Sequence, residues 1–352
     1  MKALSLFANV GIGECYLEEN GIEVVVANEF LEDRAEFYRK LYPNTNMICG
    51  DITDPDVYNS VKEAAEGVDL IIATPPCQGM SIAHAKRATK NDPRNSLIMK
   101  VVDFINDLNP KYILVENVAG MAKTFINHNG EPTLIMNYIK DNIPEHYTIK
   151  YKVLNASDYG TPQNRKRLIT LITREERWLH PDPLPSKITV RQAIGHLPSL
   201  ESDEGSDIPW HHGKHHNKNH IKWMQHTPTG ESAFDNKIHF PKTVDKESGL
   251  LRRIKGFKST YKRIDWDKPS PTVTMTNGSV NSQNNVHPGN KLPSGLYSDA
   301  RVLSVREILI LCGLPADWLD DHQEEKESFI RKVLGECFPP KFSLAIIKNI
   351  GK

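Results

Sequence analysis

The stretch Leu70-Ile71-Ile72-Ala73-Thr74-Pro75-Pro76-Cys77-Gln78-Gly79 decides the fold of the first half of the chain. Its four leading apolar residues predict a short buried strand, and the two prolines end that strand. Cys77 then follows in a stiffened turn, at the place where open α/β sheets carry their reactive groups. A buried, inert thiol is the alternative, because free cysteine packs as a small hydrophobe. The Pro-Pro-Cys-Gln turn favours a reactive thiol.

Strand and helix patterns alternate on both sides of this stretch. Strands are expected at 3–8, 23–27, 47–49, 70–73 and 112–115, helices from near residue 14 and at 31–42, 55–65 and 96–108, and two further strands at 148–154 and 168–173. Alternation of this kind predicts βαβ units and a parallel sheet covered by helices on both faces. The expected fold class is therefore α/β, with a Rossmann-like sheet.

Composition excludes several classes of protein. The 352 residues contain no run of about 18 apolar residues, so no membrane span is expected. Five cysteines without paired spacing indicate a reducing compartment and argue against a disulfide framework or a zinc knuckle. The formal net charge is zero, so a nucleic-acid partner would have to be held by a local basic surface.

The character of the sequence changes after Arg174. Residues 180–270 are rich in proline, glycine, histidine and lysine, which predicts a second, loop-rich domain, and helical periodicity returns at 304–312 and 341–350. The histidine-rich run 210–220 could hold a metal, but it lacks a helical histidine pair with a carboxylate. A polar loop that is solvated or faces a nucleic acid is the preferred interpretation.

Residues at the ends of the first three strands suggest a cofactor site. Phe7 and Gly11 belong to a glycine turn after the first strand, Glu29 ends the second, and Asp51 and Ile52 follow the third. A glycine turn lets a ligand approach the backbone, and an acid after the second strand can accept both hydroxyls of a ribose. The spacing is not Gly-x-Gly-x-x-Gly and no Walker lysine follows, so a cofactor without a pyrophosphate, S-adenosyl-L-methionine, fits best. Ordinary turn glycines are the alternative.

Three further elements suggest covalent chemistry. Glu116 ends the fifth strand, and Arg165 and Arg167 belong to the run Gln163-Asn164-Arg165-Lys166-Arg167. With Cys77 they would supply a nucleophile, an acid and a cationic clamp at one sheet edge. Taken singly, a glutamate after a strand is usually a capping residue and a basic run is usually a solvated face. Their order relative to Cys77 makes the joint interpretation specific.

On these residues, the chain resembles the cytosine-C5 DNA methyltransferases of bacterial restriction–modification systems. The resemblance covers nearly the whole chain. The resemblance is carried by Pro75-Pro76-Cys77-Gln78, Glu116-Asn117-Val118, residues 163–167, Arg301-Val302-Leu303-Ser304-Val305-Arg306-Glu307, Cys312-Gly313-Leu314-Pro315, and residues 335–340 with the terminal helix. The chain departs from the family at Asn9 and near Ile12, where relatives have glycine, and at Glu336, where relatives have asparagine.

The resemblance implies a mechanism for these residues. Cys77 would attack C6 of a cytosine flipped out of the duplex, and C5 would then accept the methyl group of S-adenosyl-L-methionine. Glu116, in its protonated form, would serve N3 and the exocyclic amine, while Arg165 and Arg167 would steady O2. Phe7, Gly11, Glu29, Asp51, Ile52 and Glu336 would form the cofactor pocket. No metal is expected.

The resemblance also implies domains and partners. Residues 1–175 would form the first part of the catalytic domain, 176–285 a target-recognition domain, and 286–352 the return to the catalytic domain. The expected partners are double-stranded DNA with a specific recognition sequence and a cognate restriction endonuclease, and the expected state is a monomer on DNA in the bacterial cytoplasm. Two rival hypotheses are a tRNA cytosine-5 methyltransferase and a catalytically silent nucleic-acid-binding module.

Overall fold

The computed structural model describes residues 1–76, 93–175, 177–245 and 248–351. The chain divides into two compact units. Unit 1 contains Met1–Ala156, Lys166–Pro183 and Pro340–Lys352, and unit 2 contains Ser157–Arg165 and Leu184–Pro339. These limits differ from the domains expected from the sequence, because residues 286–339 lie in unit 2 and only the last segment returns to unit 1.

The described residues of unit 1 form a seven-stranded sheet in the order β3-β2-β1-β4-β5-β9-β8. Its strands are β1 (Lys2–Leu6), β2 (Glu23–Glu29), β3 (Asn46–Cys49), β4 (Leu70–Ala73), β5 (Tyr112–Asn117), β8 (Thr148–Asn155) and β9 (Lys166–Thr173). The first five pair in parallel, and β9 runs antiparallel to both β5 and β8. This is the Rossmann-like α/β fold expected from the alternating pattern.

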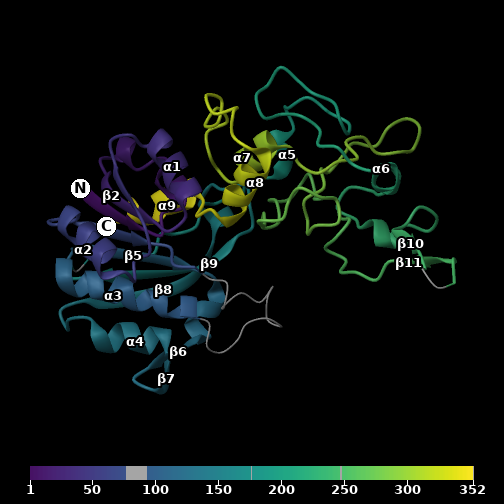
Figure 1. The fold of residues 1–352 in the computed structure, drawn as a ribbon. Coiled ribbons are helices and arrows are strands. Elements are labelled where there is room, and N and C mark those ends of the chain that lie inside the picture. Colours follow the sequence, from purple (N-terminus) through teal and green to yellow (C-terminus); the bar gives the residue numbers. More distant parts are fainter. Residues whose placement is uncertain (77–92, 176, 246–247, 352) are drawn as a thin grey trace. The chain divides into compact units, whose positions relative to one another are not determined.

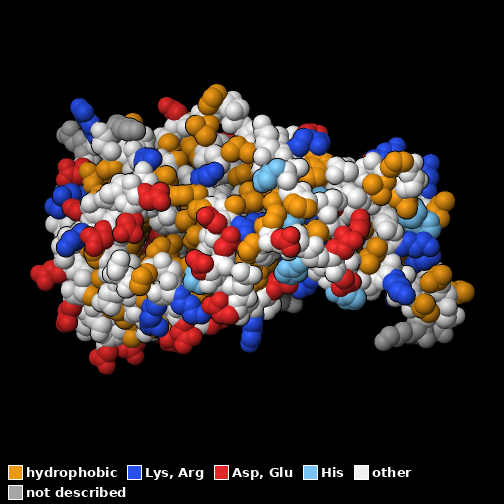
Figure 2. Space-filling model, turned by 90° about the horizontal axis from the view of Figure 1, so that it is seen from above, with side chains coloured by type: hydrophobic (Ala, Val, Ile, Leu, Met, Phe, Trp, Pro, Cys, Tyr) orange, Lys and Arg blue, Asp and Glu red, His pale blue; other side chains and the backbone are white. Residues whose placement is uncertain are grey.

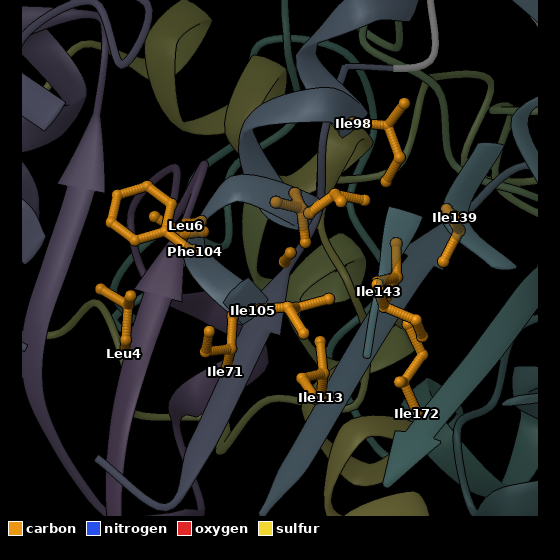
Figure 3. Close-up of a cluster of buried hydrophobic side chains, with 14 of the residues drawn as sticks. Leu4, Leu6, Ile71, Ile98, Phe104, Ile105, Ile113, Ile139, Ile143 and Ile172 are labelled. Carbon is orange, nitrogen blue, oxygen red and sulfur yellow. The ribbon is translucent and has the colours of Figure 1, made fainter. Parts of the chain in front are cut away.

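Helices cover both faces of this sheet (Figure 1). On one face lie α2 (Pro55–Ala64), α3 (Leu97–Leu108) and α4 (Ile135–Asn142), whose apolar residues join those of the strands in one buried cluster. Figure 3 shows Phe104 and Ile105 of α3 against strand residues that include Leu4 and Ile71. On the other face, α1 (Glu32–Leu41) packs Ala35 and Tyr38 against the strands. The alternation of side chains along β2, with Val26 in the first cluster and Ala27 in the second, follows from the strand period.

Local signals explain most of the element boundaries. The α2 helix begins at Pro55 because the Asp54 carboxylate accepts the N–H groups of Asp56 and Val57, and proline suits the first helical position.

The expected helix from near residue 14 is wrong: the chain there forms only two 3₁₀ turns, Ile12–Glu14 and Glu18–Asn20. Gly21, at φ 76°, follows at once, so the segment is too short for an α-helix.

The last helix also belongs to unit 1. The α9 helix (Pro340–Ile347) packs against the 3₁₀ turn Ile12–Glu14, and the buried Trp178 donates its indole N–H to the carbonyl of Ile346. A separate hairpin of β6 (Phe125–His128) and β7 (Glu131–Leu134) precedes α4. Among the described residues, no helix has both the length and the apolar character needed to cross a bilayer.

Unit 2 is rich in loops, as its composition predicts. Its described elements are α5 (Val190–Ile194), α6 (Lys218–Gln225), the short hairpin β10 (Lys242–Val244) and β11 (Leu251–Arg253), α7 (Val305–Leu311) and α8 (Glu327–Glu336). A buried ion network lies beside its apolar core: the guanidinium of Arg301 binds both Glu307 and Asp299 at 2.9 Å, with all three side chains at most 1% exposed. Fully paired buried charges of this kind are costly to break, so they fix the loop arrangement.

Candidate active site

The carboxyl ends of the five parallel strands lie at one edge of the sheet of unit 1. The β1 strand pairs with β2 on one side and β4 on the other, so the chain leaves the sheet in opposite directions from β1 and β4. In open α/β sheets, ligands bind at such a switch point, outside the carboxyl ends. Phe7 follows β1, Glu29 ends β2, and Thr74 follows β4 at this edge.

The turn after β1 has an unusual backbone. Phe7, Asn9 and Gly11 have φ values of 59°, 53° and 73°, which is the left-handed region. The N–H of Asn9 donates to Oε2 of Glu29 at 2.9 Å, and the N–H of Leu31 donates to Oε1 at 3.0 Å. Glu29 is only 6% exposed, so this carboxylate is fixed by the two segments that flank it.

The residues at this edge fit an adenosyl group. A carboxylate oxygen accepts two hydrogen bonds, so Glu29 keeps capacity for the two hydroxyls of a ribose beside its two backbone donors. Gly11 has no side chain and packs on Tyr38 and Tyr42, and Ile52, after β3, is a buried apolar residue. Asp51 is exposed and accepts the N–H of Thr53 at 2.9 Å. The sequence predicted these residues together, and the structure places all of them in unit 1.

Glu116 and Arg167 form an ion pair in unit 1. Glu116 lies on β5 and Arg167 on β9, and the antiparallel register sets Asn117 opposite Leu168, one residue from each partner. The Nε of Arg167 lies 2.7 Å from Oε1 of Glu116, and the two side chains are 13% and 11% exposed. A carboxyl and a guanidinium held together in a nearly dry site can stabilise charge that develops on a bound base.

The strand that leads to Cys77 is fastened to β5. The buried side chain of Asn117 donates Nδ2 to the carbonyl of Pro75 at 2.9 Å, and its Oδ1 accepts the N–H of Val118 at 2.8 Å. Cys77 itself lies outside the described residues. The sequence motif Glu116-Asn117-Val118 contains Asn117 but predicts no role for it, and its position directly after Glu116 is the one signal of that role.

The remaining predicted site residues lie in unit 2. Arg165 is 3% exposed and donates to the carbonyls of Val273 at 3.0 Å and Gly335 at 3.2 Å. Glu336 ends α8 and is half-buried. The structure thus gives the two arginines of the basic run different partners, whereas the sequence analysis gave them one role.

The histidine-rich run is a structural part of unit 2. The ring of His211 is buried between the Ser304 hydroxyl and the carbonyl of Pro198, and His216 accepts the N–H of Val302. Across the described ranges, no three His, Cys, Asp or Glu side chains gather in a way that could hold a metal ion.

The strand order, the glycine-bearing turn after β1, the acid that ends β2 and the acid–arginine pair on β5 and β9 fit a Rossmann-like methyltransferase. The chain belongs to the C-5 cytosine-specific DNA methylase family, whose model matches residues 1–352. It is therefore a DNA (cytosine-5)-methyltransferase.

Individual relatives agree with this assignment. The chain is 45% identical to the Type II methyltransferase M1.HgaI of Avibacterium volantium, over 99% of this chain and 97% of that protein. It is 28% identical to the Type II methyltransferase M1.HphI of Haemophilus parahaemolyticus, over 99% and 86%.

Solved structures share the fold. A DNA modification methyltransferase encoded within an E. coli prophage matches with a TM-score of 0.70 and 20% identity, covering 99% of this chain and 98% of that one. A DNMT2 of Spodoptera frugiperda matches with a TM-score of 0.63 and 17% identity, covering 100% and 99%.

Proposed function

We propose that this DNA methylase transfers a methyl group from S-adenosyl-L-methionine to C5 of a cytosine that is flipped out of a specific duplex sequence. The observation that carries the proposal is the ion pair of Glu116 and Arg167, at 2.7 Å, beside the Asn117 bond that fixes Pro75. Both contacts support a role for an acid and a cation beside the segment that leads into Cys77.

Each residue has a chemical task in this proposal. The thiolate of Cys77 attacks C6 of cytosine, which breaks the C5–C6 double bond and makes C5 nucleophilic. Glu116, in its protonated form, donates to N3 and takes up the charge that enters the ring, while Arg167 steadies O2. When bound, the cofactor supplies an electrophilic methyl group on a sulfonium. After C5 has taken the methyl group, the C5 proton leaves and the bond between C6 and Cys77 breaks.

Arg165 has a positioning task instead. Its two hydrogen bonds to the carbonyls of Val273 and Gly335 tie the start of the basic run to two distant segments of unit 2. A buried guanidinium bound to backbone carbonyls is a rigid support. Arg165 therefore acts through the backbone of this run, and Arg167 acts on the base.

The cofactor would be held at the carboxyl edge of the sheet. Glu29 would accept the ribose hydroxyls, and Phe7 and Ile52 would pack on the adenine, with Asp51 at the rim. Gly11 would let the backbone of the turn come close to the amino-acid part. Glu336 of unit 2 is the remaining proposed contact, on the strength of the resemblance in its motif.

Target recognition is proposed for unit 2, and its hairpin supports this. The segment 237–258 around β10 and β11, the recognition arm, exposes five large apolar side chains: Ile238, Val244, Leu250, Leu251 and Phe257, each more than half exposed. Its described residues also expose six basic side chains, which are Lys237, Lys242, Arg252, Arg253, Lys255 and Lys258. Figure 2 shows apolar and basic side chains next to each other around this hairpin. Basic groups suit phosphates and apolar groups suit base edges, so the recognition arm fits duplex DNA.

The biological setting follows from the relatives. Two relatives are named Type II methyltransferases, and on that resemblance we propose a cognate restriction endonuclease as the partner of this enzyme. The enzyme would act as a monomer on DNA in the bacterial cytoplasm, because each target cytosine needs only one active site.

Trapping on a fluorinated base tests the mechanism. A cytosine with fluorine at C5 can be attacked by Cys77 and methylated, but it has no C5 proton to lose. We expect a covalent adduct, stable on denaturing gels, that forms with duplex DNA of the right sequence only when S-adenosyl-L-methionine is present. The Cys77→Ala variant should give no adduct. The matched control, Cys15→Ala, should give a normal adduct. Trapping on tRNA instead of DNA would favour the tRNA enzyme, and no trapping with bound cofactor would favour the silent binding module.

A further inference from the structure

A buried carboxyl lies directly behind the proposed cofactor turn. Glu14, in the 3₁₀ turn after β1, is 6% exposed, and its neighbours Ser5 and Tyr38 are 2% and 0% exposed. The Ser5 hydroxyl, on β1, donates to Oε1 at 2.5 Å, and the Tyr38 hydroxyl, on α1, donates to Oε2 at 2.5 Å. One side chain thus joins a strand, a turn and a helix that are separate in the sequence.

The same helix forms the floor of the turn. The rings of Tyr38 and Tyr42 lie 4.8 Å apart, and the Tyr42 hydroxyl donates to the carbonyl of Gly11 at 2.8 Å. A Cβ added to Gly11 would clash with the Tyr42 ring and would lie 2.8 Å from Cε2 of Tyr38. The position of Gly11 is therefore set by the two tyrosines, and the position of Tyr38 is set in turn by Glu14.

We propose that Glu14 is a positioning residue for the S-adenosyl-L-methionine site, which holds the turn Phe7–Gly11 in its binding conformation through Ser5 and Tyr38. The inference rests on the proposed function only in taking this turn as part of the cofactor site. It deepens that proposal because neither the resemblance nor the catalytic mechanism uses Glu14.

The bracket formed by Glu14, Ser5 and Tyr38 suits a neutral carboxyl. Burial raises the pKa of Glu14 to about 7, against the smaller opposing effect of the two hydroxyl donors. The titratable group in contact with it is Tyr38; α9, which packs against the 3₁₀ turn Ile12–Glu14, has only the exposed Lys341. A hydroxyl can donate or accept, so Ser5 and Tyr38 satisfy the protonated carboxyl as well as the ionised one.

Ionisation should loosen the bracket. Two neutral hydroxyls cannot neutralise a buried carboxylate, so a charged Glu14 favours an opened arrangement that admits water. Affinity for S-adenosyl-L-methionine should therefore fall as the pH rises through about 7, the pKa of Glu14. Glutamine has the same shape without the charge, and its amide can both accept and donate within the bracket.

Cofactor binding to the full-length protein, measured by calorimetry between about pH 6 and pH 8.5, tests the proposal. The wild type should bind more weakly at the high end, whereas Glu14→Gln should bind with nearly constant affinity across the range. Tyr38→Phe, which keeps the ring and loses the hydroxyl, should weaken binding roughly five- to tenfold, the effect of one buried hydrogen bond. Its kcat at saturating cofactor should stay unchanged, because the bracket touches neither the base nor Cys77.

Glu19→Gln is the matched control, since Glu19 is exposed a few residues further on, and it should behave as wild type. Glu14→Ala should reproduce the loss seen with Tyr38→Phe, and its melting temperature shows whether it folds. Two results would overturn the proposal: affinity for the cofactor lost in Glu14→Gln at every pH, which would make the carboxylate a counter-charge for the sulfonium, or unchanged binding in Tyr38→Phe. Failure of the wild type to bind the cofactor at all would instead refute the proposed function.

Discussion

Replacing Asn117 tests whether the segment before Cys77 must be fastened to β5 for catalysis. The Asn117 side chain is 2% exposed and donates Nδ2 to the carbonyl of Pro75 at 2.9 Å. Asn117→Ala removes this donor and leaves the Pro75 carbonyl without its hydrogen-bond partner from β5. Leaving a buried carbonyl without its hydrogen-bond donor costs about 1–3 kcal/mol. If Cys77 must be held in place during its attack, the same amount enters the activation free energy, and kcat should fall about 5- to 150-fold.

Single-turnover methylation of a duplex substrate, with cofactor affinity measured in parallel, separates this effect from others. Affinity for the cofactor should remain, because the turn at Phe7–Gly11 and Glu29 are attached to β1 and β2. Asn117→Asp should be worse than alanine, since a second oxygen would face the Pro75 carbonyl. Asn106→Ala is the matched control: Asn106 also donates to a carbonyl, that of Asn142 at 3.0 Å, but from an exposed position on α3. A methylation rate in Asn117→Ala equal to that of the control would refute the reasoning.

Three other predictions follow from the structure. The pKa of Glu14 is raised from 4.5 to about 7 in the folded protein, so its contribution to stability is present below about pH 4.5 and lost as the pH rises through about 7. In denaturant titrations over that range, the free energy of unfolding of the wild type should fall by up to about 3 kcal/mol relative to that of Glu14→Gln. Arg167→Ala should lower kcat by about 10²–10³, and its melting temperature should fall too because Glu116 loses its partner. Arg165→Ala should lower the melting temperature with a much smaller effect on kcat, and a larger loss of kcat in Arg165→Ala than in Arg167→Ala would exchange their roles. Lys242→Ala with Lys255→Ala should weaken binding to all duplexes and reduce the salt dependence by a slope of roughly 1–2, unlike a double replacement of exposed lysines in unit 1.

The sequence predicted the sheet better than it predicted what surrounds it. The β4 strand begins and ends where its apolar run and the following prolines require, at Leu70 and Ala73, because both signals are local. A helix was predicted to begin near Glu14, and the chain there forms only 3₁₀ turns. Gly21 ends the segment locally, and the Glu14 side chain is also bound to β1 and α1, partners that the segment alone does not reveal.

The same limit applies to the candidate site. Glu116 and Arg167 were expected at one edge, and they pair because β5 and β9 are antiparallel neighbours. Arg165 and Arg167 look equivalent in the run Gln-Asn-Arg-Lys-Arg. A strand can begin between them, however, and then only the second arginine belongs to the strand. Here the strand β9 begins at Lys166, so only Arg167 lies on it. The point at which the run enters the sheet depends on pairing over the length of β8, which the five residues do not encode.

The departures at Asn9 and Ile12 show what a cofactor turn needs physically. Glycine is common in such turns because it adopts positive φ without strain, but asparagine is among the side chains that tolerate the left-handed region. Asn9 has φ 53° and still directs its N–H to Glu29, so the replacement keeps both the backbone shape and the hydrogen bond. Ile12 is buried at the start of the 3₁₀ turn, where its side chain contributes to packing. Gly11 has no such substitute, because the tyrosine floor leaves no room for a Cβ. The need for glycine at each position thus depends on the backbone φ and on the space available for a Cβ. Another residue can replace glycine where its side chain tolerates that φ and fits that space.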